Sequence, residues 1–191
     1  MGQRLNIEIK NNKNVLANCY YHWSGFTTSS LKLTKKIIEY LKVNNVSNDV
    51  KGAIELLYHT GASFTKQSWE NAKNDKLIEG DYKEIADRNN GLIGVSESDI
   101  KKTQSWEEGR IEINIENKTF KFDCAFEKDY IDYDEIWYRI SDLFYKINLD
   151  KTSKYQIPFY QIDILLDGII ESEKNYKGRF YFNNYCFDSV Y

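Results

Sequence analysis

The sequence predicts a single α+β domain in which antiparallel hairpins pack against several helices. Two segments, residues 4–23 and 111–126, alternate apolar and polar side chains around a short polar turn, as hairpins do. Apolar residues recur at helical spacing between these segments and after the second one. Because strands and helices come in blocks and no linker interrupts them, we treat residues 1–191 as one domain and expect an antiparallel sheet.

The first hairpin begins with a strand over Arg4 to Lys10, followed by a turn at Asn11–Asn14 and a returning strand over Val15 to Trp23. Successive side chains of a strand point to opposite faces. One face of the returning strand therefore carries Cys19, Tyr21 and Trp23, and the other carries Asn18, Tyr20 and His22. We expect one face to join the core and the face with Tyr20 and His22 to meet solvent, a pocket or a partner.

A helix is expected from about Ser29 to Val43, with Thr27, Thr28 or Ser29 as its N-cap. Ser47, Asn48 or Asp49 is expected to cap a second helix, whose apolar positions run from Val50 to Tyr58. Short helices are predicted after Thr65 and Asp81. Residues 92–98 are predicted to form a loop or a short strand, with a brief turn at Ser98–Asp99.

The second hairpin is followed by a strong helical stripe from Asp134 to Ile147. Pro158 fits the first turn of a further helix, which continues to about Lys174. One or two aromatic strands are predicted over residues 178–187.

Composition narrows the function classes. The 26 basic and 29 acidic residues give a net charge of −3, which argues against a general nucleic-acid-binding protein. No apolar run approaches the ~18 residues that span a bilayer, so we expect a cytoplasmic protein with no membrane partner. Neither a glycine-rich phosphate loop nor a metal-binding cysteine or histidine motif occurs, and we expect no cofactor and no metal.

The segment Cys19–Ser30 combines aromatic rings, hydroxyl groups and a histidine between a predicted strand and a predicted helix. A similar sequence surrounds the second histidine, His59. Arg88 lies beside Asn89, and Arg110 lies in the segment that contains Trp106. Aromatic rings stack on planar ligands, and arginine binds phosphate or carboxylate through paired hydrogen bonds. The predicted ligand contacts are Tyr20, His22, Trp23, Ser24, Thr27, His59, Thr60, Arg88, Asn89, Trp106 and Arg110.

Other interpretations of these residues remain open. Each histidine fits an ordinary rim position, and the arginines fit surface salt bridges. Catalysis by Cys19 with His22 is disfavoured because a spacing of three on a strand sends the two side chains to opposite faces. The acidic residues Asp123, Asp129, Asp132, Asp134 and Glu135 fit either a solvated helix start or a metal site of oxygen ligands. The face from Asp129 to Glu135 also fits a surface that binds a basic partner.

The opening Met1–Ile9 together with Leu16–Gly25 resembles uncharacterised proteins of bacteriophages and prophages of low-GC Gram-positive bacteria. The resemblance covers roughly the first forty residues and implies a phage accessory protein, a class that includes inhibitors of host defence. By analogy, the leading hypothesis is a non-enzymatic protein that sequesters a nucleotide-derived immune signal. The alternatives are an acidic inhibitor of a host defence nuclease or effector and a histidine-dependent hydrolase; a homo-oligomer is left open.

Overall fold

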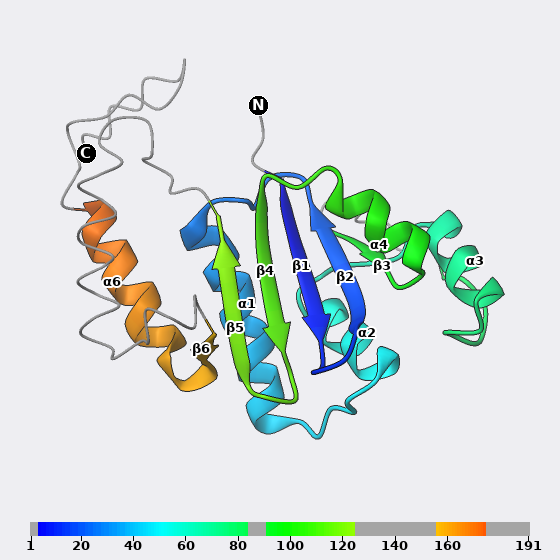
Figure 1. The fold of residues 1–191 in the computed structure, drawn as a ribbon, viewed down its shortest axis with the longest axis horizontal. Coiled ribbons are helices and arrows are strands. Elements are labelled where there is room, and N and C mark those ends of the chain that lie inside the picture. The colour runs from blue at the N-terminus through cyan, green and yellow to red at the C-terminus, as the bar shows by residue number, and fades with distance from the viewer. Residues whose placement is uncertain (1–3, 84–90, 125–155, 175–191) are drawn as a thin grey trace, which may run out of the picture.

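The computed structural model describes residues 4–83, 91–124 and 156–174 (Figure 1). It confirms the α+β prediction, with strands gathered into one mixed sheet and helices packed against it. Both predicted hairpins are present, and the helices predicted from about 29, 50, 66 and 158 all have counterparts.

The sheet has six strands in the order β3-β2-β1-β4-β5-β6. Their bounds are β1 Leu5–Lys10, β2 Val15–Tyr21, β3 Leu92–Gly94, β4 Gly109–Asn114, β5 Thr119–Asp123 and β6 Ile157–Pro158. All neighbouring strands pair antiparallel except β1 and β4, which run parallel. The expectation of an antiparallel sheet is therefore wrong at the centre of the sheet. There the first strand of each hairpin, β1 and β4, pair with each other in parallel.

The helices are α1 Thr27–Val43, α2 Val50–His59, α3 Lys66–Asn74, α4 Glu97–Gln104 and α6 Ile162–Lys174, the last preceded by the 3-10 turn η1 Phe159–Gln161. The predicted cap Asp49 begins α2 by accepting a hydrogen bond of 2.9 Å from the Gly52 amide. The predicted cap Thr65 begins α3 in a reciprocal pair with Ser68.

The two faces of the sheet differ in polarity. Leu5, Ile7 and Ile9 of β1 are fully buried on the face toward α1 and α2, beside Ile111 and Ile113 of β4. The intervening residues of the same strands are polar and lie on the opposite face. α4 lies on this polar face at the β2 end of the sheet, where side chains of β1 and β2 hydrogen-bond with it (Figure 1). The alternation predicted for β1 and β4 thus places one polar face beside α4.

Four boundaries differ from the predictions. β2 ends at Tyr21, so His22 and Trp23 lie beyond the strand. α1 begins at Thr27 after Phe26, so the predicted capping residues lie inside the helix, where Thr27 and Thr28 are buried and Ser29 is exposed. Pro158 lies in β6 instead of a helical first turn, and the turn predicted near Ser98 is part of α4, which Ser96 caps.

Several predicted features lie outside the described residues: the helix over 134–147, the strands over 178–187, the acidic segment 129–135, and most of the helix expected after Asp81. Asp81 itself lies in irregular backbone. Within the described residues, no helix combines the length and the apolar character that crossing a membrane requires.

Candidate aromatic ligand site

Four predicted contact residues form a continuous chain of rings, which we call the aromatic cluster: Tyr20, His22, Trp23 and Trp106. Tyr20 meets Trp106 edge-on at 5.7 Å between ring centroids, and its hydroxyl lies 3.2 Å from Nδ1 of His22. His22 meets Trp23 edge-on at 4.9 Å. Edge-to-face pairs at these distances are favourable, so the cluster is held together by its own contacts.

The two tryptophans of the aromatic cluster reach solvent although they are large apolar side chains. Trp23 is 68% exposed and Trp106 is 38% exposed, whereas Tyr20 between them is only 8% exposed. Tryptophan is highly buried on average in folded proteins, so two partly exposed ones joined by a buried tyrosine are an informative exception. The arrangement offers ring surface to a planar ligand on a base that is packed into the protein.

The turn that carries Trp106 is anchored to the start of β1. The Glu108 and Gly109 amides both donate to the Arg4 carbonyl at 2.9 Å. The Glu108 carboxylate accepts from the Arg4 amide at 2.9 Å and from its guanidinium at 3.0 Å. These bonds fix the position of Trp106 beside Tyr20, because Asn6 of β1 pairs directly with Tyr20 of β2.

A second set of polar contacts lies beneath this turn. The Glu107 carboxylate accepts from the side-chain amide of Asn6 at 3.2 Å and from Arg110 through two nitrogens, one of them at 3.0 Å. Glu8, which is 3% exposed, accepts from Gln104 at 2.7 Å and lies 3.9 Å from Arg110. Arg110, predicted as an anion clamp, is therefore occupied by carboxylates of the protein itself.

Cations flank the aromatic cluster on two sides. Lys102 of α4 places Nζ 5.3 Å from the ring centre of Trp106 and has no ion pair within the described residues. On the other side, Arg4 lowers the pKa of Glu108 by hydrogen bonding to its carboxylate. Burial raises the pKa of the Tyr20 phenol, an effect that the nearby Arg4 charge opposes. Among the described residues, Lys102 is thus the cation beside the rings that is left open to an anionic ligand.

The second histidine segment lies on the other face of β2. Tyr21, whose side chain points opposite to that of Tyr20, makes a short hydrogen bond with the Thr60 hydroxyl. Thr60 also donates to the Leu57 carbonyl at 2.6 Å, and His59 packs on the ring of Tyr40 at 4.4 Å. The structure therefore does not bring His59 and Thr60 to the aromatic cluster.

The remaining predicted contacts are scattered. Thr27 is fully buried at the start of α1, where its hydroxyl donates to the Cys124 carbonyl at 2.9 Å. Ser24 is half-buried in the segment between β2 and α1. Arg88 and Asn89 lie outside the described residues.

Sequence reasoning missed three residues that shape the site: Arg4, Lys102 and Glu108. Lys102 precedes Trp106 by four positions at the end of α4, which is the signal that would have paired them. Arg4 and Glu108 carry no such signal, because their contact depends on the pairing of β1 with β4 across a long sequence separation.

The chemistry of this site suits binding by stacking and hydrogen bonding. Among residues 4–83, 91–124 and 156–174, no group of three or more histidine, cysteine, aspartate or glutamate side chains is placed to hold a metal ion. His22 offers its second ring nitrogen beside the exposed face of the cluster, since Nδ1 is engaged by Tyr20.

In comparisons with known proteins, no protein-family model, curated protein or solved structure matches the chain.

Proposed function

We propose that the aromatic cluster binds a nucleotide-derived small molecule and that the protein acts by sequestering it. The observation that supports this most strongly is the pair of partly exposed tryptophans, Trp23 and Trp106, joined through Tyr20 and His22 and flanked by Lys102, which has no ion pair in the part of the chain that the structure describes. A nucleotide combines a planar base with an anionic group, and each half has a complement here.

The base is held by stacking on an exposed tryptophan ring. Stacking of a base on an aromatic side chain contributes about 1–3 kcal/mol. Trp23, with most of its surface in water, is the main platform, and Trp106 supplies a second ring surface nearby. The second nitrogen of His22 adds a hydrogen bond to the edge of the base or to a sugar hydroxyl.

The anionic group is held by Lys102, whose charge lies beside Trp106. The Arg4 guanidinium is close to the cluster but is paired with the Glu108 carboxylate at 3.0 Å, so it contributes less. Binding through the Lys102 ammonium group should be sensitive to salt, because an exposed charge pair is screened within about 10 Å at 0.1 M salt.

The resemblance of the first segment to phage proteins supports a biological role in which the protein removes a nucleotide signal of host defence from solution. A protein inhibitor acting through the acidic segment and a hydrolase acting through a histidine are the competing functions. The binding experiment distinguishes all three, because only the first predicts a stoichiometric, chemically unaltered ligand.

The test measures binding of a panel of mononucleotides, dinucleotides and cyclic nucleotides by isothermal titration calorimetry. Trp23→Ala is expected to weaken the best ligand by about 10-fold or more, and Lys102→Ala by about fivefold with a loss of salt dependence. Tyr160→Ala is the matched control, since Tyr160 is an aromatic residue 72% exposed on η1, outside the cluster.

Equal binding by the parent and the Trp23→Ala protein would refute the proposal. Mass spectrometry of small molecules released from the heated protein identifies the natural ligand. Recovery of a chemically altered nucleotide would favour the enzyme, and recovery of a host protein with no nucleotide would favour the inhibitor.

A further inference from the structure

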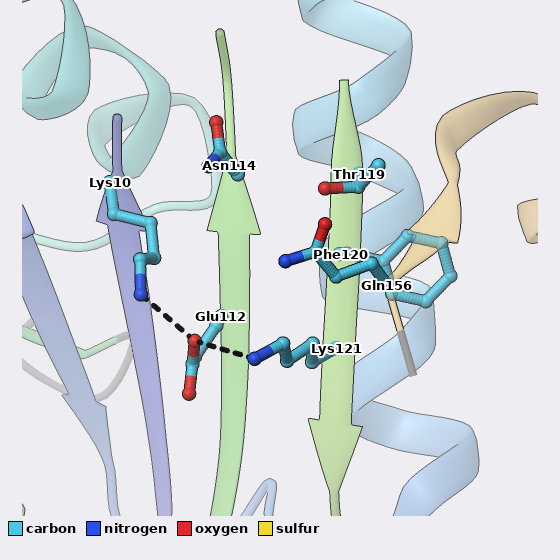
Figure 2. A pocket seen from close by; sticks show the side chains of 7 residues that line it. All are labelled: Lys10, Glu112, Asn114, Thr119, Phe120, Lys121 and Gln156. Atoms are coloured by element: carbon cyan, nitrogen blue, oxygen red, sulfur yellow. Dashed lines mark hydrogen bonds and ion pairs between the residues drawn. The ribbon is translucent and has the colours of Figure 1, made fainter. Parts of the chain in front are cut away.

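A small hollow opens on the polar face of the sheet, at the end of β1 opposite to Arg4. Its volume is about 30 Å³, the scale of a few water molecules. Figure 2 shows Lys10 of β1 and Lys121 of β5 on either side of Glu112 of β4. The full lining is Lys10, Glu112, Asn114, Thr119, Phe120, Lys121 and Gln156.

The carboxylate in this hollow is already engaged. Lys10 Nζ lies 3.0 Å from Oε2 of Glu112, and Lys121 Nζ lies 3.8 Å from the same oxygen. Burial opposes ionisation of Glu112, but the hydrogen bond from Lys10 and the neighbouring charges lower its pKa overall. Glu112 is therefore a fixed anion shared by two ammonium groups, each of which keeps further N–H donors.

The amide acceptor in the lining is also occupied. Oδ1 of Asn114 accepts from the Glu116 amide at 3.1 Å and from the Asn117 amide at 2.9 Å. Its side-chain nitrogen donates to Asn12 at 3.0 Å. Asn114 thus shapes the turn after β4 and offers little acceptor capacity to the hollow.

Two further donors face no partner of their own. In the described part of the chain, the Thr119 hydroxyl and the Gln156 side-chain amide make no hydrogen bond. Together with the two ammonium groups they give the hollow four groups able to donate, while the charged acceptor in its lining, Glu112, is already shared by both lysines. Thr119 and Gln156 also carry one acceptor oxygen each, and Gln156 is exposed, so what the hollow offers a ligand is the excess positive charge of two lysines over one glutamate.

We propose that this hollow binds a small carboxylate anion between Lys10 and Lys121, with Thr119 and Gln156 as additional donors. Two lysines and one glutamate give the lining a net charge of +1, so one monoanion neutralises it. A doubly charged phosphate leaves an excess negative charge next to Glu112, and its larger volume suits the small hollow less well. The site is independent of the aromatic cluster, with which it shares no residue.

The test is a titration of the full chain with sodium acetate at constant ionic strength, followed by backbone amide NMR. Saturable shifts are expected at residues 119–121 and at Gln156. Lys121→Ala is expected to weaken acetate binding about fivefold, the effect of losing one partly exposed charged donor. Thr119→Val, which keeps the side-chain shape, is expected to weaken it about twofold.

Lys13→Ala is the matched control, because Lys13 is an exposed lysine in the turn between β1 and β2 and its loss changes the net charge equally. Unchanged amide shifts outside the hollow show that each variant is folded. Linear, non-saturating shifts, or equal weakening by Lys13→Ala and Lys121→Ala, would overturn the site. Inorganic phosphate binding more tightly than acetate would overturn its assignment to a monoanion.

Discussion

Glu107→Ala tests the polar contacts that support the Trp106 turn. Asn6 is fully buried, its side-chain nitrogen donates to Glu107, and its Oδ1 has no hydrogen-bond partner among the described residues. Removing the Glu107 carboxylate leaves the whole Asn6 amide without a partner and takes from Arg110 its two-point acceptor.

The expected loss of stability follows from these two contacts. A buried amide donor left without an acceptor costs about 1–3 kcal/mol. The ion pair with Arg110, whose side chain is about one third exposed, contributes about 0.5–1 kcal/mol after solvent screening. The free energy of unfolding should therefore fall by about 1.5–4 kcal/mol.

Urea unfolding followed by far-ultraviolet circular dichroism measures this change. Glu108→Ala is the control, since its pair with Arg4 is more exposed than the pair of Glu107 with Arg110 and no buried amide depends on it, so its loss should destabilise less. Asn6→Leu removes the stranded amide, so Glu107→Ala in that background should cost at least about 1 kcal/mol less.

The reasoning fails if Glu107→Ala destabilises no more than Glu108→Ala. It also fails if the losses of unfolding free energy caused by Asn6→Leu and Glu107→Ala simply add in the double variant. Additivity would mean that the buried Asn6 amide does not depend on the Glu107 carboxylate.

Two further predictions concern the framework around the site. Asp49→Ala should cost about 0.5–2 kcal/mol in urea unfolding, because the carboxylate caps α2. The Gly52 amide lowers the pKa of Asp49 below its ordinary 3.8, so the stability from this cap is present above that pH and is lost as pH falls through the lowered pKa. Asp49→Asn should flatten this acid dependence, and an unchanged acid profile would contradict it. Gly91→Ala should destabilise by about 1–3 kcal/mol or more, because φ is +113° and the added methyl would lie 2.6 Å from Cys19 and Tyr21; thermal unfolding at or above the parent Tm would contradict this.

Local signals in the sequence were sufficient for much of the fold. The alternation of Leu5, Ile7 and Ile9 predicted both β1 and the polarity of its two faces, because a strand has a period of two. Asp49 and Thr65 predicted where two helices begin, since a cap is a contact between near neighbours.

The pairing of the two hairpins was not predictable from the same kind of signal. Alternation in β4 indicates a half-buried strand, and this pattern fits a parallel neighbour as well as an antiparallel one. The parallel register, which sets Leu5 against Gly109 and Asn6 against Arg110, is a choice between segments about a hundred residues apart.

That same pairing decides the site. It brings the Trp106 turn to the start of β1 and hence to Tyr20. Tyr20 and Trp106 were both predicted as ligand contacts, but nothing in the sequence indicated that they touch each other. The two histidines diverge because Tyr20 and Tyr21 point to opposite faces of β2, so the segment that bonds to Tyr21 cannot reach the aromatic cluster. Arg110 is paired with Glu107, three residues before it in the chain, and is therefore not the free anion-binding arginine that was predicted.

The most direct test of the proposed ligand site is fluorine NMR of the protein labelled with 5-fluorotryptophan. Trp→Phe variants assign each resonance, and the best-binding nucleotide is then titrated. The account predicts that Trp23 and Trp106 shift together and saturate at the same ligand concentration, while Trp69, which packs against Phe64, stays unchanged. A saturating shift at Trp69 alone, or no shift at Trp23 with a bound nucleotide, would contradict the aromatic cluster as the binding site.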